Sequence, residues 1–293
     1  MNNLVSVIIP THNRPVMLKL ALESVLNQTY KNIEVIVIDD GIEMRAKDVI
    51  SSFNDNRIVY FQNEKSLGSA ISRNIGIKKA TGEYIAFLDD DDQWMPNKLE
   101  KQIEMFSKTP NDVGYSFTSV INEFDDHEET TIVPNGIADY HSQIVDGMRT
   151  LTVTLVIKKE VFDKVGMFDE DFPNHQEMEL MFRVSKEYKG LAINEPLTRV
   201  SMRTNYARVT NASIERRIKG REMLIEKHFD DFKKYPRSLA NHYFRLGLWN
   251  RDLRNYKQAQ QYFKKAWKAH FRFRYVLHWK LMLFKGVIYK LRN

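Results

Sequence analysis

Four consecutive aspartates, Asp89 to Asp92, are the side chains of this sequence best suited to chemistry. They follow the apolar segment "YIAFL" and precede "QWMPNKL", which is typical of a helix start. Adjacent carboxylates repel one another, and a bound divalent cation relieves that repulsion. Mg²⁺ and Mn²⁺ prefer oxygen ligands, usually one or two carboxylates together with phosphate oxygens of a substrate. The run therefore indicates a site for a hard cation. The alternative is an acidic turn in contact with solvent.

Apolar runs alternate with helical patterns in the first part of the chain, and this alternation predicts how the aspartates are positioned. The expected strands lie at residues 4–10, 33–40, 57–62 and 83–88, with helices expected at 15–26 and 68–80. Strands that are apolar on both faces and alternate with helices are typical of a parallel α/β sheet. In such sheets ligands bind beyond the carboxyl ends of the strands. Three of these strands end in "PTHN", "DDG" and "DDDD", so we expect their ends to form one site.

The middle of the chain is less regular. We expect a strand at residues 151–159, a short helix and turn at 160–170, and a helix at 176–188. The polar stretch 123–147 has no periodicity and is predicted to form a long loop.

Composition excludes several classes of function. The 293 residues contain no cysteine, which rules out disulfides, zinc ribbons and thiol catalysis and fits a reducing cytoplasm. The first residues, "MNNLVSVIIP", do not resemble a signal peptide. No uncharged apolar run approaches the roughly 20 residues that span a bilayer. We therefore expect a cytoplasmic protein that is either soluble or peripheral at the inner face of the plasma membrane.

Charge is distributed unevenly. From Glu215 onward there are 21 Lys and Arg against 6 Asp and Glu, and no acidic residue follows Asp252. This basic region, 211–293, has a helical pattern, and its spacing resembles either a tetratricopeptide-like hairpin or an ordinary amphipathic helix pair. Its aromatic tail from Phe271 fits a membrane interface, a dimer contact or a cap on the core. The unbalanced positive charge favours the membrane surface.

Four segments in order carry a resemblance to a known family: "VSVIIPTHNR", "IEVIVIDDG", "SRNIGIKKATGEYIAFLDDDDQWMPNKL" and "VGMFDEDF…QEMELMFRV". They resemble the inverting nucleotide-sugar glycosyltransferases of family 2, over residues 4–203. The resemblance implies a Rossmann-like, mostly parallel sheet with flanking helices, the A-type glycosyltransferase fold, followed by an α-helical C-terminal region. The expected divisions are a nucleotide-sugar-binding half (1–115), an acceptor-binding and catalytic-base half (116–210) and the basic helical region (211–293). No dinucleotide or P-loop motif competes with this interpretation.

For the nucleotide, the resemblance implies that Pro10 and His12 line the nucleobase pocket and that Asp40 accepts a hydrogen bond from a uracil-type base. Arg73 would reach the diphosphate or ribose, and Asp90 would face the ribose. The alternatives are a turn aspartate at position 40 and a surface helix arginine at position 73. The chain also reads "DDGIEM" where the family usually has "DDGSxD", so contacts made by that loop differ.

For the metal, the resemblance implies that Asp89 and Asp91 are the two aspartates of an Asp-x-Asp signature that binds Mn²⁺ or Mg²⁺. Asp91 is the better ligand of the two. Asp92 would support the site or cap the following helix.

For the chemistry, the resemblance implies inversion, with a carboxylate removing the proton of the acceptor hydroxyl. Glu177 takes the base position, with Glu in place of the more usual Asp. Glu179 is either structural or a contact for the acceptor. Arg203 stands near the family's usual histidine and is either a diphosphate contact or a surface arginine.

The leading hypothesis is therefore transfer of a hexosyl or N-acetylhexosaminyl group from a nucleoside-diphosphate donor, best a UDP-sugar, to a hydroxyl of a bacterial surface glycan or lipid-linked acceptor. The sequence leaves the particular sugar, the acceptor and the oligomeric state open. A second hypothesis is a non-catalytic sugar-nucleotide-binding scaffold with a helical interaction module. A nucleic-acid binder, suggested by the basic tail, is disfavoured because no nucleic-acid motif is present.

Overall fold

The computed structural model describes residues 3–43, 46–203 and 213–290, with side chains up to Met282 in the last helix. The chain forms two compact units that interleave along the sequence. The sheet unit comprises Met1–Tyr140, Thr150–Glu170 and Leu180–Tyr206. The helical unit comprises His141–Arg149, Asp171–Glu179 and Ala207–Asn293. Two segments from the expected catalytic-base half are thus grouped with the C-terminal helices.

The first half of the sheet consists of parallel strands in the order β3-β2-β1-β4. Their bounds are Val5–Thr11 (β1), Ile33–Asp39 (β2), Ile58–Gln62 (β3) and Tyr84–Phe87 (β4). Each was expected from an apolar run, and all four predictions are confirmed. The order reverses between β1 and β4, and such a switch point is where ligands bind in α/β sheets.

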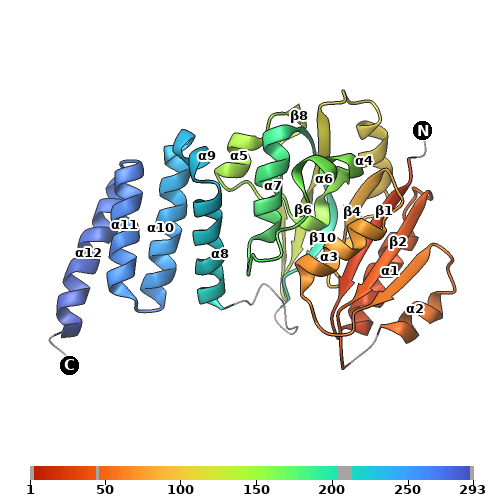
Figure 1. Ribbon diagram of the computed structural model, residues 1–293, viewed down its shortest axis with the longest axis horizontal. Helices are drawn as coiled ribbons and strands as arrows, with labels where there is room; N and C mark the ends of the chain where they lie inside the picture. Colours follow the sequence, from red (N-terminus) through yellow and green to blue (C-terminus); the bar gives the residue numbers. More distant parts are fainter. Residues whose placement is uncertain (1–2, 44–45, 204–212, 291–293) are drawn as a thin grey trace. The chain divides into compact units, whose positions relative to one another are not determined.

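The second half of the sheet mixes directions. β9 (Val156–Lys158) pairs antiparallel with β4 and with β6 (Val113–Glu123). β10 (Lys189–Ser201) then runs parallel to β6, and β5 (Gln93–Trp94) closes the order as an antiparallel edge strand. Strands β1, β2, β3, β4, β6 and β10 of the ten-stranded sheet therefore share one direction. The predicted class, a mostly parallel α/β sheet, is confirmed (Figure 1).

Helices cover both faces of the parallel half. α1 (Pro15–Leu26) buries Leu18, Leu22 and Val25 in one cluster with alternate residues of β1. α3 (Ser69–Lys79) lies against the opposite face, where Gly76 sits over Ile8 of β1. The other helices of this unit are α2 (Lys47–Phe53), α4 (Lys98–Phe106), α6 (Lys159–Val165) and most of α7 (Gln176–Glu187).

The prediction of one long loop at 123–147 is wrong. β6 extends to Glu123, and β7 (Glu128–Thr131), β8 (Gly136–Ala138) and α5 (His141–Val145) follow. β7 pairs with β6 and β8 with β10, both antiparallel. Every side chain of β7 is exposed, so this strand has no apolar face to produce an alternating pattern.

The prediction of a strand over 151–159 is only partly right. Residues Thr152–Thr154 form a 3-10 turn before β9. The Thr154 hydroxyl donates to the Leu151 carbonyl at 2.7 Å, which closes the turn locally. Threonine side chains compete with strand pairing in this way.

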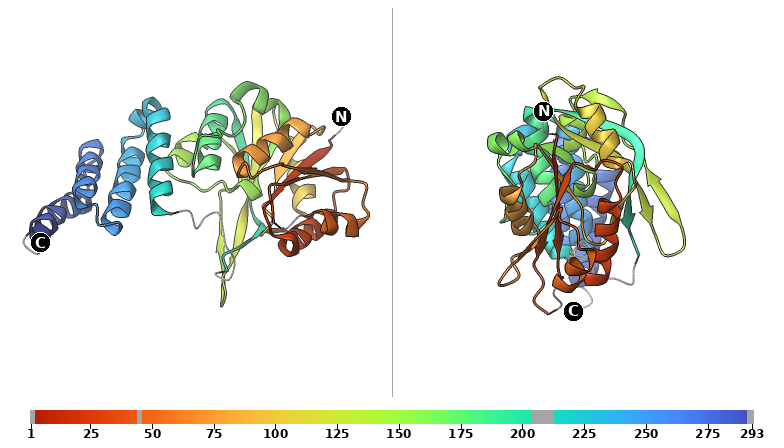
Figure 2. Two further views of the ribbon diagram at one scale, coloured as in Figure 1. Left: turned by 60° about the horizontal axis from the view of Figure 1, so that its bottom comes forward. Right: turned by 90° about the vertical axis from the view of Figure 1, so that its right-hand side faces the viewer.

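The helical unit confirms the expectation of a helical C-terminal region. Its main helices are α8 (Ile214–Lys227), α9 (Phe229–Lys234), α10 (Pro236–Asp252), α11 (Tyr256–Ala269) and α12 (Phe273–Lys290). α10 and α11 form a hairpin, in which a Cβ at Gly247 would lie 2.5 Å from the Phe263 ring. α11 and α12 then pack together, as Figure 2 shows.

Helix α12 presents two apolar faces. Tyr275 and Met282 are buried against the preceding helices, so this face caps the core of the unit. Phe273, Leu277 and Leu281 are exposed. Among the described residues, no helix combines the length and apolar character that a bilayer crossing requires.

Candidate functional site

The aspartate run lies at the carboxyl end of β4, as the sequence predicts. Carboxylate oxygens of Asp89, Asp91 and Asp92 lie within 4.8 Å of one another. Asp89 and Asp91 are partly exposed, whereas Asp90 and Asp92 are buried. Three carboxylates that converge at this spacing form an oxygen donor set that suits a hard divalent cation.

Arg14, from the turn after β1, pairs with two aspartates of the run. Its guanidinium lies 2.7 Å from Asp90 and 3.2 Å from Asp91. The Thr11 hydroxyl donates to the other oxygen of Asp90 at 2.7 Å. Burial raises the pKa of the Asp90 carboxyl to about 7, while Arg14 and Thr11 act in the opposite direction. Sequence reasoning missed both partners, although both belong to "PTHNR".

Arg73, from α3, pairs with Asp89 at 2.5 Å, and its guanidinium lies 5.6 Å from the centre of the Phe168 ring. The neighbouring Asn74 fixes Phe168 by its backbone. The Asn74 amide donates to the Phe168 carbonyl at 2.9 Å, and its carbonyl accepts from the Phe168 amide at 3.0 Å. The Asn74 amide also donates to Glu170 at 2.8 Å. The motifs "SRN" and "MFDE" therefore meet beside the aspartates. Both motifs are recognisable in the sequence, but no local pattern there indicates a role for Asn74 or Phe168.

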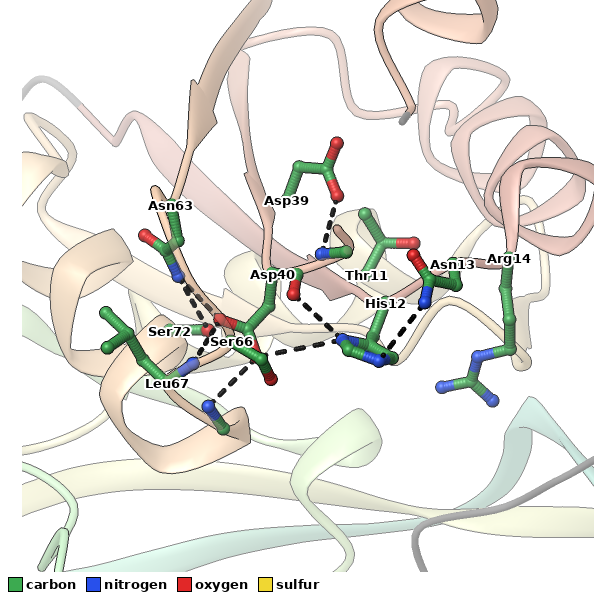
Figure 3. Close-up of polar contacts among 12 residues, drawn as sticks. Thr11, His12, Asn13, Arg14, Asp39, Asp40, Asn63, Ser66, Leu67 and Ser72 are labelled. Atoms are coloured by element: carbon green, nitrogen blue, oxygen red, sulfur yellow. Dashed lines mark hydrogen bonds and ion pairs between the residues drawn. The ribbon is translucent and has the colours of Figure 1, made fainter. Parts of the chain in front are cut away.

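Asp40 lies beyond β2 and organises the segment between β3 and α3 (Figure 3). Its carboxylate accepts four hydrogen bonds, of 2.7–2.9 Å, from Asn63, Ser66, Leu67 and Gly68. Burial alone would raise the pKa of this carboxyl, but the four hydrogen bonds outweigh burial and lower it. Because a carboxylate has about four acceptor positions, Asp40 is engaged by the protein itself.

His12 lies beside Asp40, as Figure 3 shows. Its Nδ1 is 2.8 Å from the Asp40 carbonyl oxygen, which fits donation from Nδ1–H. Pro10 lies past the last residue pair between β1 and β4, which joins Ile8 to Phe87. Because proline has no N–H to donate to a ladder, it suits the point where these two strands stop pairing.

Asp39 holds the described residues on either side of positions 44–45, and the last residue of the unusual "DDGIEM" sequence lies outside the described residues. This buried carboxylate accepts from the backbone amides of Gly41 and Ala46, both at 2.9 Å, and from the Tyr60 hydroxyl at 2.7 Å. The two aspartates after β2 therefore have distinct partners: Asp39 holds the loop that follows it, and Asp40 holds the loop after β3.

Two further sequence candidates lie near β10. Asp92 accepts from the Ser201 backbone amide at 2.9 Å. The expected role of Asp92 as a helix cap is wrong, because the N-cap residue of α4 is Asn97. Arg203 pairs with Glu123 of β6 at 2.6 Å and is largely exposed.

Helix α7 carries the remaining candidates. Glu177 and Glu179 lie in its first turn, which belongs to the helical unit. Glu179 is fully buried, and one of its oxygens lies 2.9 Å from Lys227 and 3.2 Å from His228. Of the two roles considered for Glu179, these ion pairs favour the structural one. Further along the helix, Arg183 donates to the carbonyls of residues 165–167, which fixes the turn after α6.

The sequence of this chain is similar to those of known glycosyltransferases. A sequence model described as "Glycosyl transferase family 2" matches residues 6–165. An uncharacterised glycosyltransferase of Rickettsia typhi is 31% identical over 220 residues, covering 72% of this chain and 67% of the relative. The Escherichia coli protein WfgD is named a UDP-Glc:α-D-GlcNAc-diphosphoundecaprenol β-1,3-glucosyltransferase. It is 41% identical over 119 residues, 41% of this chain and 47% of its own length.

Solved structures share the fold. Staphylococcus aureus TarS 1-349 in complex with UDP-GlcNAc aligns with a TM-score of 0.64 at 13% identity, covering 91% of this chain and 89% of that chain. The mannosyltransferase PcManGT of Pyrobaculum calidifontis, in complex with GDP-Man and Mn²⁺, aligns with a TM-score of 0.62 at 16% identity. That alignment covers 98% of this chain and 80% of that chain.

The fold is therefore the A-type glycosyltransferase fold, and the aspartate cluster lies at the end of its fourth strand. The sequence likeness extends through the parallel half of the sheet and includes Arg14, Arg73 and the four aspartates. The chain belongs to glycosyltransferase family 2.

Proposed function

We propose that this glycosyltransferase moves a hexosyl or N-acetylhexosaminyl group from a UDP-sugar to a hydroxyl of a lipid-linked or surface-glycan acceptor in bacteria, with inversion. The observation that carries the proposal is the cluster of Asp89, Asp91 and Asp92 at the switch point of the sheet, with Arg14 and Arg73 paired to the same run. The UDP donor and the lipid-linked acceptor are supported by the names of WfgD and of the TarS complex.

Asp89 and Asp91 would hold Mn²⁺ or Mg²⁺, with Asp92 adjacent. Bound there, the cation would offset the negative charge that develops on the leaving diphosphate. Arg14 and Arg73 offset part of the negative charge of the run, and guanidinium groups also suit phosphate oxygens. Pro10, His12 and Asp40 stay our candidates for the nucleobase end, and Asp90 for the ribose. Because the Asp40 carboxylate already accepts four hydrogen bonds, a contact with the base would require one of them to be exchanged.

Glu177 is the proposed general base. Its carboxylate would accept the proton of the acceptor hydroxyl as that oxygen attacks the anomeric carbon opposite the diphosphate. Arg203 stays a candidate for the diphosphate, in which case it would leave its ion pair with Glu123. Glu179 is the less favoured candidate for the acceptor, because its carboxylate is buried in ion pairs.

The test is release of UDP from a panel of UDP-sugars in the presence of Mn²⁺ or Mg²⁺. The donor is first identified by measuring which UDP-sugar raises the melting temperature, because a ligand that binds only the folded state does so. We expect Glu177→Gln to reduce kcat by about 100-fold or more, the lower range for loss of a general base. Asp91→Asn should abolish the stabilisation that metal gives to donor binding.

Two exposed carboxylates serve as matched controls. Glu187→Gln changes an exposed carboxylate on the same helix as Glu177, and Asp112→Asn changes one at a distant surface turn. We expect both variants to keep the activity of the parent enzyme. Full activity in Glu177→Gln, or in Asp91→Asn with metal present, would remove these assignments. Donor binding without turnover, with several acceptors tried, would instead favour the non-catalytic scaffold.

We further propose a cytoplasmic protein that rests on the inner face of the membrane through α12. Its exposed residues Phe273, Leu277 and Leu281 recur every four positions and form one stripe. At 100° per residue, Arg274 and Lys280 flank that stripe on either side. An apolar stripe with basic flanks suits an interface of anionic lipid, where the apolar side chains enter the headgroup region.

Sedimentation with vesicles tests this surface. We expect binding to phosphatidylglycerol vesicles that weakens with salt, and little binding to phosphatidylcholine. Leu277→Glu combined with Leu281→Glu should abolish the binding, while Lys268→Ala on α11 reduces it only slightly. Binding that persists in the double variant excludes this stripe as the membrane contact, and no binding of the parent protein to phosphatidylglycerol vesicles excludes the membrane role. A dimer in solution that the double variant dissociates would assign the stripe to a second copy of the chain.

A further inference from the structure

The segment that carries Glu177 is built by the C-terminal helices. Residues Asp171–Glu179 cluster with α8 and α10 in the helical unit, although in sequence they lie between two parts of the sheet unit. The family match ends at residue 165, before this segment begins. The surroundings of Glu177 therefore depend on the part of the chain that the family pattern does not describe.

The backbone before α7 is held closely by α8. His175 has a φ of 65°, a left-handed conformation that side chains other than glycine adopt at a cost. A Cβ at Gly220 of α8 would lie 2.6 Å from the Asn174 carbonyl oxygen, so only glycine permits this approach. Arg216 also donates to the Pro173 carbonyl at 3.3 Å. Three consecutive residues before Gln176 are thus fixed either by strain or by α8.

The side chains form a second layer of contacts. The His175 ring stacks on Trp249 of α10, with centres 6.2 Å apart and planes at 16°. The Arg221 guanidinium lies 5.0 Å from the centre of the same indole. Arg221 Nη1 lies 3.0 Å from His242 Nδ1, and His242 Nε2 lies 3.2 Å from the Val145 carbonyl of α5. Arg221 is therefore held on one side by an aromatic face and on another by a histidine.

The Arg221 guanidinium is buried in the helical unit, and burial disfavours its charged form. Burial lowers the pKa of the Arg221 guanidinium to about 10, and Arg245 lowers it further, whereas the negative charge of Glu177 raises it. The Nε of Arg221 and Nε2 of His175 are buried with no hydrogen-bond partner among the described residues. Buried polar atoms without partners are rare because they cost stability, so these two atoms beside the turn that carries Glu177 need an explanation other than folding alone.

The far end of α8 holds the same turn of α7. Lys227 and His228, at its C-terminus, pair with the buried Glu179 carboxylate. Glu177 therefore lies between a backbone fixed at residues 173–175 and a side chain fixed at residue 179. Rigid support on both sides of a reacting group is what precise placement of a catalytic side chain requires.

We propose that α8 and α10 position the catalytic base, with Arg221 as the positioning residue that orients the Glu177 carboxylate by charge. This inference rests on the proposed function, because it takes Glu177 to be the base. The titratable and charged groups packed around this turn include the Glu179 carboxylate and, of the basic residues, His175, Arg216, Arg217, Arg221, Lys227, His228, His242 and Arg245. Among them, Arg221 lies against the Trp249 ring on which His175, two residues before Glu177, also stacks, and the negative charge of Glu177 raises the pKa of Arg221.

The test compares Arg221→Met with Arg221→Lys in the full-length enzyme. We expect Arg221→Met to lower kcat by about tenfold or more with the donor KM nearly unchanged, because none of the proposed donor contacts lies on this turn. The acid limb of the kcat–pH profile should move to higher pH, since loss of a nearby cation favours the protonated carboxyl. Arg221→Lys should restore the acid limb toward its original position. Unchanged kcat and an unchanged acid limb in folded Arg221→Met overturn the proposal.

Two further variants distinguish failure of this inference from failure of the proposed base. If Arg221 acts through Glu177, the double variant Arg221→Met with Glu177→Gln is no slower than Glu177→Gln alone. If Glu177→Gln keeps full activity, Glu177 is not the general base and the proposed function fails at that residue. If Glu177→Gln is inactive but Arg221→Met has the kcat of the parent enzyme, Glu177 stays the base and only the positioning role of Arg221 is refuted.

Should Arg221→Met not fold, Gly220→Ala decides the question. The added methyl group pushes on the Asn174 carbonyl, and we expect a lower kcat with the donor KM unchanged. Lys219→Ala, the exposed neighbour on the same helix, is the control. Equal kcat in Gly220→Ala and Lys219→Ala would contradict the proposal.

Discussion

Two arginines explain how the protein tolerates four adjacent aspartates. Arg14 pairs with Asp90 and Asp91, and Arg73 pairs with Asp89. Asp90 is buried, and an unpaired buried carboxylate would cost several kcal/mol or take up a proton. The arginines therefore offset the repulsion in the protein itself. The same groups are suited to phosphate oxygens, so we expect them to exchange partners when a nucleotide diphosphate binds.

At the residue scale, Asn74 provides the sharpest prediction of stability. Asn74→Ala removes two buried hydrogen bonds to Phe168 and a partly buried one to Glu170, and it leaves the backbone groups of Phe168 without these partners. We expect the free energy of unfolding to fall by about 2–3 kcal/mol, because an unsatisfied buried polar group costs about 1–3 kcal/mol. Urea denaturation measures the change, with exposed Asn111→Ala as control. A loss below about 0.5 kcal/mol would show that Asn74 does not hold this turn.

At the element scale, the strands most clearly predicted from the sequence are those whose side chains are buried on both faces of the sheet. β1, β2 and β4 are buried on both faces, so continuous apolar runs revealed them. β7 is exposed throughout, and its sequence "EETT" resembles a loop. The aspartate run was found because its residue type alone indicates chemistry. Arg14 and Asn74 were missed because their roles depend on partners 77 and 94 residues away in sequence, which no local pattern reveals.

Packing of α3 on β1 gives the prediction at this scale. A Cβ at Gly76 would lie 2.5 Å from Cγ2 of Ile8, so the helix or the strand must shift. Gly76→Ala should destabilise the protein by about 1–2 kcal/mol, because overpacking costs about 1–3 kcal/mol and alanine recovers up to about 1 kcal/mol of helix propensity. Thermal and urea unfolding measure it against Lys78→Ala, an exposed position of the same helix. A stabilised Gly76→Ala protein would mean that this contact is loose.

At the scale of the whole molecule, the order of the chain hides a division of labour. Residues 171–179 belong to the helical unit, so the proposed base and the aspartate cluster are built by different parts of the chain. Helix α7 contributes its first turn to one unit and its remainder to the other. Charge asymmetry in the sequence marked the basic helical region, but it could not reveal that these helices also support the segment that carries the proposed base.

Two buried histidines of the helical unit, His175 and His242, predict how the stability of the protein depends on pH. Burial, and next the charge of Arg221, lower the pKa of the His175 imidazole to about 3. The same two causes hold the pKa of His242 well below its usual value. A histidine with a depressed pKa in the folded state binds its proton mainly after unfolding. Its contribution to stability is therefore complete above about pH 6.5 and is lost as the pH falls toward 3.

For His175 alone, we expect a loss of about 2 kcal/mol between pH 7.5 and pH 5, at 1.36 kcal/mol per pH unit below its unfolded-state pKa. Urea denaturation at both pH values measures the slope. His175→Asn keeps a residue that tolerates the left-handed backbone and removes the titrating ring. We expect this variant to lose less stability than the parent protein between the two pH values, whatever its stability at pH 7.5. Equal losses in the two proteins would show that His175 is protonated in the folded state, and that the turn before Glu177 is open to solvent.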